Sequence, residues 1–241
     1  MKENIYTIPV IESFENGGEC AFCAMHEKLT QDAIDFMLGN AYMEDDIRME
    51  TNRLGFCKNH LEKLYTQQNR LGLSLIMHTH LQDVNKTVKK LLTDVDKSKG
   101  GLFKKTAESK TAKIVKQINS LSQSCYICER INNTFDRYVD TFFYLWKKDS
   151  DIKNIVKKSK GFCLNHYAVL LQTGEAKLAP ADFNEFLDIT VPLQIENFQT
   201  LEDDLDWFIK KYDYRFVNEP WKNSKDALPR TLKKIQSVDA K

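Results

Sequence analysis

The six cysteines of this 241-residue chain and two of its five histidines form two copies of one spaced pattern. Each copy begins with Cys-x-x-Cys and continues, after a long interval, with Gly-Phe-Cys-x-Asn-His. The candidate ligands are Cys20, Cys23, Cys57 and His60 in the first copy, and Cys125, Cys128, Cys163 and His166 in the second. Three thiolates and one imidazole are the ligand set of a closed tetrahedral zinc site. We therefore expect two Zn²⁺ ions per chain, one bound by each copy.

A nearly constant offset relates the two copies. The Cys-x-x-Cys pairs lie 105 residues apart, and the Cys-x-x-His pairs lie 106 apart. The pairs Asp35/Asp140 and Ile47/Ile152 keep the offset of 105. Such self-similarity indicates internal duplication rather than two metal motifs that arose independently.

Apolar residues at helical spacing, with five prolines and nine glycines in the whole chain, predict a mainly α fold. The fold is expected to consist of two duplicated helical modules, each tied by its own Cys3His zinc site. The predicted divisions are an extended N-terminal segment over 1–18, repeat 1 over 19–98, a lysine-rich linker over 99–118, repeat 2 over 119–212, and a packed C-terminal tail over 213–241.

The second half of each motif resembles the start of a helix, with Cys and His three positions apart on one face. A helix N-terminus favours thiolates and so favours metal binding at neutral pH. The interval between the half-sites fits two helices, so each metal would join a helical hairpin to a third helix. Four protein ligands leave no position for a substrate water, which indicates a structural role. The alternatives are an iron–sulfur cluster with one histidine ligand, and dithiol–disulfide chemistry at the Cys-x-x-Cys pairs.

The remaining histidines are weaker candidates. His26 stands three residues after Cys23, but its counterpart Ile131 cannot bind a metal, so His26 is expected at the surface. His78 and His80 point to different faces of a predicted helix, and one of them is expected to make a polar core contact. No Ser-His-Asp set, phosphate loop or dinucleotide-binding glycine pattern occurs in a supporting context. We predict no catalytic and no organic-cofactor residues, and expect a protein that is not an enzyme.

Net charge and hydropathy limit the cellular compartments and the partners that the sequence allows. The formal net charge is +1, residues 1–18 lack the pattern of a secretory signal, and no long apolar run predicts a membrane-spanning helix. Paired cysteines in a reducing cytoplasm are more often metal ligands than disulfides. We therefore expect a cytoplasmic protein without a membrane partner. A protein partner is possible, and nucleic acid could bind the lysine-rich stretches 86–116 and 147–160, although a near-zero net charge argues against it.

The chain resembles a bacterial family of unknown function that is common in anaerobic Firmicutes such as clostridia. The resemblance rests on both cysteine motifs, on Gly72-Leu73 followed by Thr79-His80-Leu81, and on a set of tail residues: Tyr212 to Arg215, Pro220-Trp221, and Asp226 to Arg230. It implies a bacterial origin and supplies no activity. It also draws attention to five tail residues that would form either a polar contact surface or a lock onto the helical body: Asp213, Arg215, Trp221, Asp226 and Arg230.

These observations predict a zinc-binding helical protein that serves as a structural or adaptor binding module. The alternatives left open are a thiol redox sensor or oxidoreductase that uses the Cys-x-x-Cys pairs, and a nucleic-acid-binding protein that uses the lysine-rich stretches.

Overall fold

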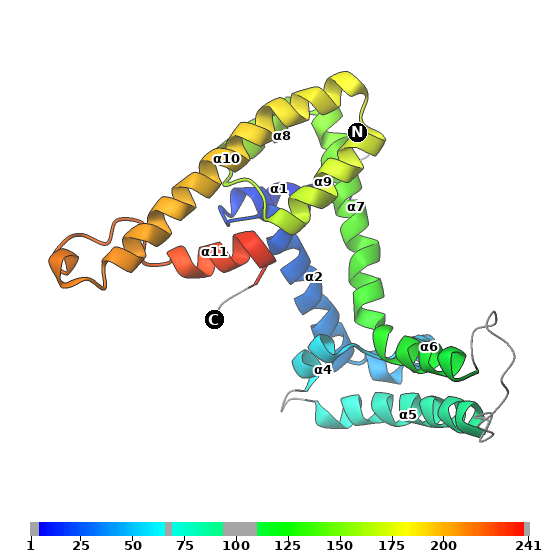
Figure 1. The fold of residues 1–241 in the computed structure, drawn as a ribbon. Coiled ribbons are helices and arrows are strands. Elements are labelled where there is room, and N and C mark those ends of the chain that lie inside the picture. The colour runs from blue at the N-terminus through cyan, green and yellow to red at the C-terminus, as the bar shows by residue number, and fades with distance from the viewer. Residues whose placement is uncertain (1–4, 66–68, 94–109, 239–241) are drawn as a thin grey trace, which may run out of the picture. The chain divides into compact units, whose positions relative to one another are not determined.

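A computed structural model describes residues 5–65, 69–93 and 110–238. Over these ranges the chain forms eleven α-helices and two 3-10 helices, with no strand, which confirms the mainly α prediction (Figure 1). The chain divides into two compact units: unit 1 comprises residues 1–28 and 134–241, and unit 2 comprises residues 29–133. The boundaries fall inside α2 (Ala21–Leu38) and α7 (Tyr126–Lys148). None of the described helices is long and apolar enough to cross a bilayer.

Unit 1 is built around aromatic side chains. Besides the start of α2 and the end of α7 it contains α1 (Thr7–Glu15), α8 (Ser150–Lys158), α9 (Leu164–Lys177), α10 (Pro180–Lys210), the 3-10 helix η2 (Tyr214–Phe216) and α11 (Ala227–Gln236). The ring of Phe142 is fully buried, and its centroid lies 5.1–6.4 Å from those of Phe14, Phe22, Phe143, Trp146 and Phe186. Aromatic rings bury large apolar areas, so this cluster is the main packing contribution of the unit.

The extended segment predicted over 1–18 is wrong where α1 forms. Val10 and Phe14 are four residues apart and both buried, so one face of this short helix packs into the core. Pro9 lies in the first turn, where the missing N–H of proline removes no intrahelical hydrogen bond. The proline that suggested an extended chain is therefore compatible with a helix start.

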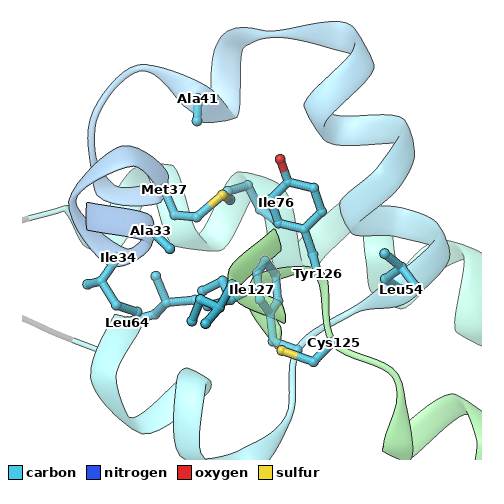
Figure 2. Packing of buried hydrophobic residues seen from close by; sticks show 12 residues of the cluster. Ala33, Ile34, Met37, Ala41, Leu54, Leu64, Ile76, Cys125, Tyr126 and Ile127 are labelled. Carbon is cyan, nitrogen blue, oxygen red and sulfur yellow. The ribbon is translucent and has the colours of Figure 1, made fainter. Parts of the chain in front are cut away.

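Unit 2 has an aliphatic core. Its elements are the end of α2, the 3-10 helix η1 (Ala41–Met43), α3 (Asp45–Leu54), α4 (Lys58–Leu64), α5 (Arg70–Thr93), α6 (Lys110–Gln123) and the start of α7. Figure 2 shows the side chains that converge there, among them Met37 of α2, Leu64 of α4, Ile76 of α5 and Ile127 of α7. Each of these four is at most 2% exposed, so the core links four helices.

Two separate helices, α4 and α5, follow Cys57. Asn69 precedes α5, and its side chain accepts a hydrogen bond from the Gly72 amide at 2.9 Å while donating one to the Leu38 carbonyl at 2.7 Å. An asparagine that satisfies a free amide in the first turn is a typical N-terminal cap. This cap explains why a new helix, α5, begins after Asn69.

The domain boundaries predicted from the sequence do not coincide with the compact units. Repeat 1 over 19–98 and repeat 2 over 119–212 each contribute residues to both units, so these boundaries stay a prediction about the duplicated sequence. Of the predicted linker, residues 99–109 lie outside the described ranges, and residues 110–118 belong to α6.

The C-terminal tail packs onto unit 1, as predicted. The guanidinium of Arg230 in α11 lies 2.8 Å from the Asp204 carboxylate of α10, and both side chains are only 15% exposed. Trp207 of α10 donates its indole N–H to the Pro220 carbonyl at 3.0 Å. Of the two roles considered for the tail residues, these contacts favour a lock onto the helical body. Asp213 and Arg215 pair with each other at 2.6 Å, and the Arg215 side chain is well exposed.

Candidate metal centres

All eight predicted ligands lie in two clusters. Centre I, in unit 1, contains Cys20, Cys23, Cys163 and His166; centre II, in unit 2, contains Cys57, His60, Cys125 and Cys128. Within each centre the four ligand atoms lie within 4.8 Å of one another. The expectation that each sequence copy closes its own site is wrong. Each centre combines the Cys-x-x-Cys of one copy with the Cys-x-x-His of the other.

Helix length explains this exchange. The helix that leaves the first Cys-x-x-Cys, α2, has 18 residues, whereas the following helix α3 has 10. In the second copy α7 has 23 residues and α8 has nine. At about 1.5 Å of rise per residue, the second helix of each hairpin covers far less distance than the first. The length of the second helix is therefore too small to carry the chain back along the whole first helix to its own Cys-x-x-Cys pair.

Every ligand lies at the N-terminus of a helix. Cys57 and Cys163 are the N-cap residues of α4 and α9, and each is followed in the first turn by the histidine of its motif. Cys20 and Cys125 directly precede α2 and α7, which places the second cysteine of each pair in the first turn. The positive end of each helix dipole therefore faces a thiol, which stabilises the thiolate form that binds metals.

In centre I the imidazole nitrogen of His166 lies close to all three cysteine sulfurs. The Nδ1 atom of His166 lies 3.1 Å from the sulfur of Cys163, 3.4 Å from that of Cys23 and 3.6 Å from that of Cys20. The sulfurs of Cys23 and Cys163 are 3.5 Å apart, and both cysteines are free thiols. All four atoms therefore face one common point.

Centre II repeats this geometry. The Nδ1 atom of His60 lies 3.4 Å from the sulfur of Cys57 and 3.3 Å from those of Cys125 and Cys128. The sulfurs of Cys57 and Cys128 are 3.8 Å apart. Around a tetrahedral Zn²⁺ with ordinary bond lengths, sulfur–sulfur separations are about 3.8 Å and sulfur–nitrogen separations about 3.5 Å. Both centres thus have the spacing of a single four-coordinate ion.

Hydrogen bonds among the ligands shift their pKa values in a common pattern. Those from Cys20 and Cys23 hold the pKa of Cys163 far below its ordinary value. Burial acts to raise the pKa of Cys57, but hydrogen bonds from the His60 amide and from the other two thiols outweigh burial and lower it. In each centre the pKa of the Cys-x-x-His cysteine is therefore lowered, which favours its thiolate form.

The pKa values of three other candidate ligands, Cys23, Cys128 and His166, are raised. The hydrogen bond to Cys163, the one to Cys20 and burial raise the pKa of Cys23, while burial and the hydrogen bond to Cys125 raise the pKa of Cys128 to about 12. For His166 burial lowers the pKa, but hydrogen bonds to Cys163 and Cys20 outweigh it and raise that pKa to about 9. These protons would be displaced when a metal binds, because only thiolates and a neutral imidazole are ligands.

A glycine begins each Cys-x-x-His half-site and is held by a side chain from a long helix. Gly55 and Gly161 have φ values of +60° and +72°, which a residue with Cβ rarely adopts. A Cβ on Gly55 would lie 2.6 Å from the His80 ring, and one on Gly161 would lie 2.7 Å from the Gln194 side-chain oxygen. Each half-site is therefore entered through a sharp turn that glycine permits.

Gln194 and His80 hold these turns by hydrogen bonds. Gln194 accepts one from the Phe162 amide at 3.0 Å and donates one to the Phe162 carbonyl at 2.6 Å. The Nδ1 atom of His80 lies 2.9 Å from the Asn52 carbonyl oxygen, which confirms a polar contact for one histidine of the His78/His80 pair. Sequence reasoning did not identify Gln194, because a lone glutamine in an amphipathic helix carries no distinguishing signal.

The other two histidines lie outside both ligand sets. His78 is exposed, while His26 is half-buried rather than at the surface. The His26 ring contacts Phe135 with its centroid 5.7 Å away, and it lies 6.4 Å from the ring of the ligand His166. His26 therefore borders centre I without belonging to its four ligands.

A hollow of about 420 Å³ lies beside α10 and α11 in unit 1. Its charged lining is largely committed to internal pairs: Arg230 binds Asp204 and Asp226, and Lys160 lies 2.7 Å from Glu19. The Arg230–Asp204 pair ties α11 to α10, and the Lys160–Glu19 pair holds the residue that precedes Cys20 of centre I.

Comparisons with known proteins identify the family alone. No curated protein and no solved structure matches the chain. The model of a family of unknown function, DUF6062, matches residues 1–241, which is the whole chain. The protein, with its two cross-paired Cys/His centres, therefore belongs to the DUF6062 family.

Proposed function

We propose that this protein binds two structural Zn²⁺ ions, one in each Cys3His centre, and serves as a helical binding or adaptor module. The observation that carries the proposal is the spacing of the ligand atoms. In both centres three sulfurs and one imidazole nitrogen lie within 4.8 Å of one another, as around one tetrahedral ion. Three soft thiolates with one imidazole favour zinc over the hard cations, which prefer oxygen ligands.

A structural role follows from the number of ligands and from their positions in the chain. Four protein ligands complete a tetrahedral site and leave no position for a substrate. Each centre joins the N-termini of two helices that are distant in sequence, α2 with α9 and α4 with α7. Metal binding would therefore close long loops and supply folding free energy directly.

The spacing also bears on the alternatives. An iron–sulfur cluster carries its ligands on different iron atoms, which spreads them farther apart than a single ion does. Dithiol chemistry at the Cys-x-x-Cys pairs would not explain why each pair lies beside a further cysteine and a histidine. These are Cys163 and His166 in centre I, and Cys57 and His60 in centre II. Of the lysine-rich stretch 86–116, residues 94–109 lie outside the described ranges, so nucleic-acid binding rests on composition alone.

Elemental mass spectrometry on protein purified without added metal tests the proposal. We expect about two zinc ions per chain, and replacement by Co²⁺ should give the visible absorption of tetrahedral thiolate coordination. Iron with sulfide, or metal-free protein with oxidised cysteines, would contradict it. The adaptor role further requires a protein partner that binds the zinc-loaded chain and loses affinity when a chelator removes the metal.

A further inference from the structure

The C-terminal helix α11 ends on centre I. Ser237 follows α11 in the left-handed conformation, with φ of 58°, and its hydroxyl oxygen lies 3.2 Å from the sulfur of Cys163. The Asn165 side-chain amide lies 3.4 Å from the same hydroxyl. A hydroxyl so placed can donate a hydrogen bond to the thiolate. Because groups that hydrogen-bond to metal ligands orient them, Ser237 would hold Cys163 in its metal-binding position.

Lys234, one turn earlier in α11, joins the two halves of centre I from outside. Its side chain is fully buried, and its ammonium group donates a hydrogen bond to the Lys160 carbonyl and lies 3.9 Å from the Glu19 carboxylate. Lys160 in turn pairs with Glu19 at 2.7 Å. Glu19 directly precedes Cys20, and Lys160 directly precedes the turn that leads to Cys163. The three side chains therefore form a clamp across both half-sites.

The charge of a zinc-loaded centre I would favour the buried position of the Lys234 ammonium group. Three thiolates and one Zn²⁺ carry a net charge of −1, and a buried charge is costly unless an opposite charge lies nearby. A buried ammonium group beside the half-sites supplies that charge. Lys234 therefore has a reason to be buried that packing alone does not give.

Centre II is held differently. Its half-sites are joined by the hydrogen bond from the Tyr126 amide to the Gly55 carbonyl, at 3.0 Å. An ion pair between residues that flank the two half-sites, Arg53 with Glu129 at 3.8 Å, has side chains 57% and 51% exposed, and such pairs contribute little to stability. Cys57 and Cys128 are half-buried, whereas all three cysteines of centre I are at most 5% exposed. Two thiols of centre II are thus more open to water and competing ligands.

From these contacts we propose that α11 locks the metal into centre I through Lys234 and Ser237, so that centre II is the exchangeable centre and releases its ion first. The inference rests on the proposed binding of two zinc ions. Release of a bound ion requires one ligand to open and another ligand to enter. At centre I the half-buried ligand is the imidazole of His166, and the buried thiolate of Cys163 must break its contact with Ser237 before it can open. At centre II the two half-buried ligands, Cys57 and Cys128, are both thiols.

The test follows zinc release from the full-length zinc-loaded protein into excess 4-(2-pyridylazo)resorcinol, with N-ethylmaleimide added at intervals and the labelled peptides identified by mass spectrometry. We expect two phases of about one ion each, separated about tenfold or more in rate. Cys57, Cys125 and Cys128 should be alkylated in the fast phase, and Cys20, Cys23 and Cys163 in the slow one. A single phase, or earlier labelling of the centre I cysteines, would overturn the inference. A zinc content well below two before the chelator is added would instead contradict the proposed function.

Two variants assign the lock to α11. Ser237→Ala removes the hydroxyl but keeps Cβ, and Lys234→Met replaces the ammonium group with an apolar chain of similar length. Each should speed the slow phase about tenfold and leave the fast phase unchanged. The matched controls are Lys233→Met, on the same helix and paired with Glu27 at 3.5 Å, and Ser122→Ala, whose exposed hydroxyl donates to the Asn119 carbonyl. Unchanged slow phases in both Ser237→Ala and a folded Lys234→Met protein would refute the role of α11.

Discussion

Centres I and II have the same ligand types at the same helix positions, but their surroundings differ. In centre I the three cysteines are buried, and α11 adds a hydroxyl and a clamp of charged side chains. In centre II two cysteines are half-buried, and a backbone hydrogen bond joins the half-sites. The comparison shows that the two centres share the same candidate ligands, whereas the contacts around those ligands differ.

The cores of the two units also differ, in the kind of side chain that packs behind each centre. Aromatic rings fill unit 1, and Phe22, one residue before Cys23, contacts the rings of Phe142 and Phe162 with centroids 5.4 and 6.0 Å away. Unit 2 packs aliphatic side chains such as Ile76 and Ile127. Centre I is therefore backed by large, closely packed rings. Centre II is backed mainly by aliphatic side chains, with the buried rings of Phe56 and Tyr126 next to its half-sites.

The largest expected effect comes from removing one ligand. In the Cys57→Ser variant, zinc should fall from about two ions to about one, because only centre II loses a thiolate, and unit 2 should lose stability with it. Alkylation should then reach Cys125 and Cys128, while Cys20 and Cys23 stay protected. Elemental analysis with peptide mapping measures both changes.

The reverse labelling pattern would be decisive against the cross-paired centres. If Cys57→Ser exposed Cys20 and Cys23 instead, each sequence copy would be binding its own metal. Cys163→Ser is the matched partner experiment, and it should expose Cys20 and Cys23 alone.

The next largest effect is expected from truncating a buried side chain in the core of each unit. Phe142→Ala should cost about 3–5 kcal/mol of unfolding free energy, and Ile127→Ala about 2–5 kcal/mol, because both remove fully buried side chains. The first should also raise the thiol reactivity of centre I, and the second that of centre II. Tyr144→Ala, at a half-exposed position of the same helix α7, is the control, with an expected change of about 0.5 kcal/mol or less. Chemical unfolding with thiol labelling gives both values, and equal reactivity of the two centres in both variants would contradict the separation.

A smaller loss is expected from the glycine turns. Gly161→Ala should cost about 2–4 kcal/mol, because Cβ is strained at positive φ and would overlap the Gln194 oxygen. Gly18→Ala is the control, since a Cβ there meets no atom within 4 Å. In the Gly161→Ala/Gln194→Ala double variant, the steric part of the loss should disappear while Gln194 no longer holds Phe162, so the two changes should not add. Additive losses in urea unfolding would argue against the clash.

Cys-x-x-Cys and Cys-x-x-His each have a local geometry that spacing reveals, so all eight candidate ligands could be named from the sequence, and the structure brings them into two clusters. Their role as metal ligands stays a prediction, whereas their grouping was predicted wrongly, for a physical reason. The grouping depends on the relative lengths of α2 and α3, and of α7 and α8, which differ too subtly in the residue pattern to be read in advance. The buried role of Lys234 was equally hidden, because lysine in an amphipathic tail helix usually faces solvent.

The smallest expected effect is the difference in unfolding free energy between variants of the two side chains that hold the glycine turns. Gln194→Leu leaves the buried amide and carbonyl of Phe162 without partners and should cost about 2–4 kcal/mol. His80→Leu removes one contact, to the Asn52 carbonyl, from a half-buried position where water can replace it, and should cost about 1 kcal/mol. Urea unfolding of both variants, with Asn197→Leu on α10 as a control for helix propensity, measures the difference. Equal losses would mean that the two turns are held equally strongly, and the unequal metal release proposed for the two centres would then have to arise from α11 alone.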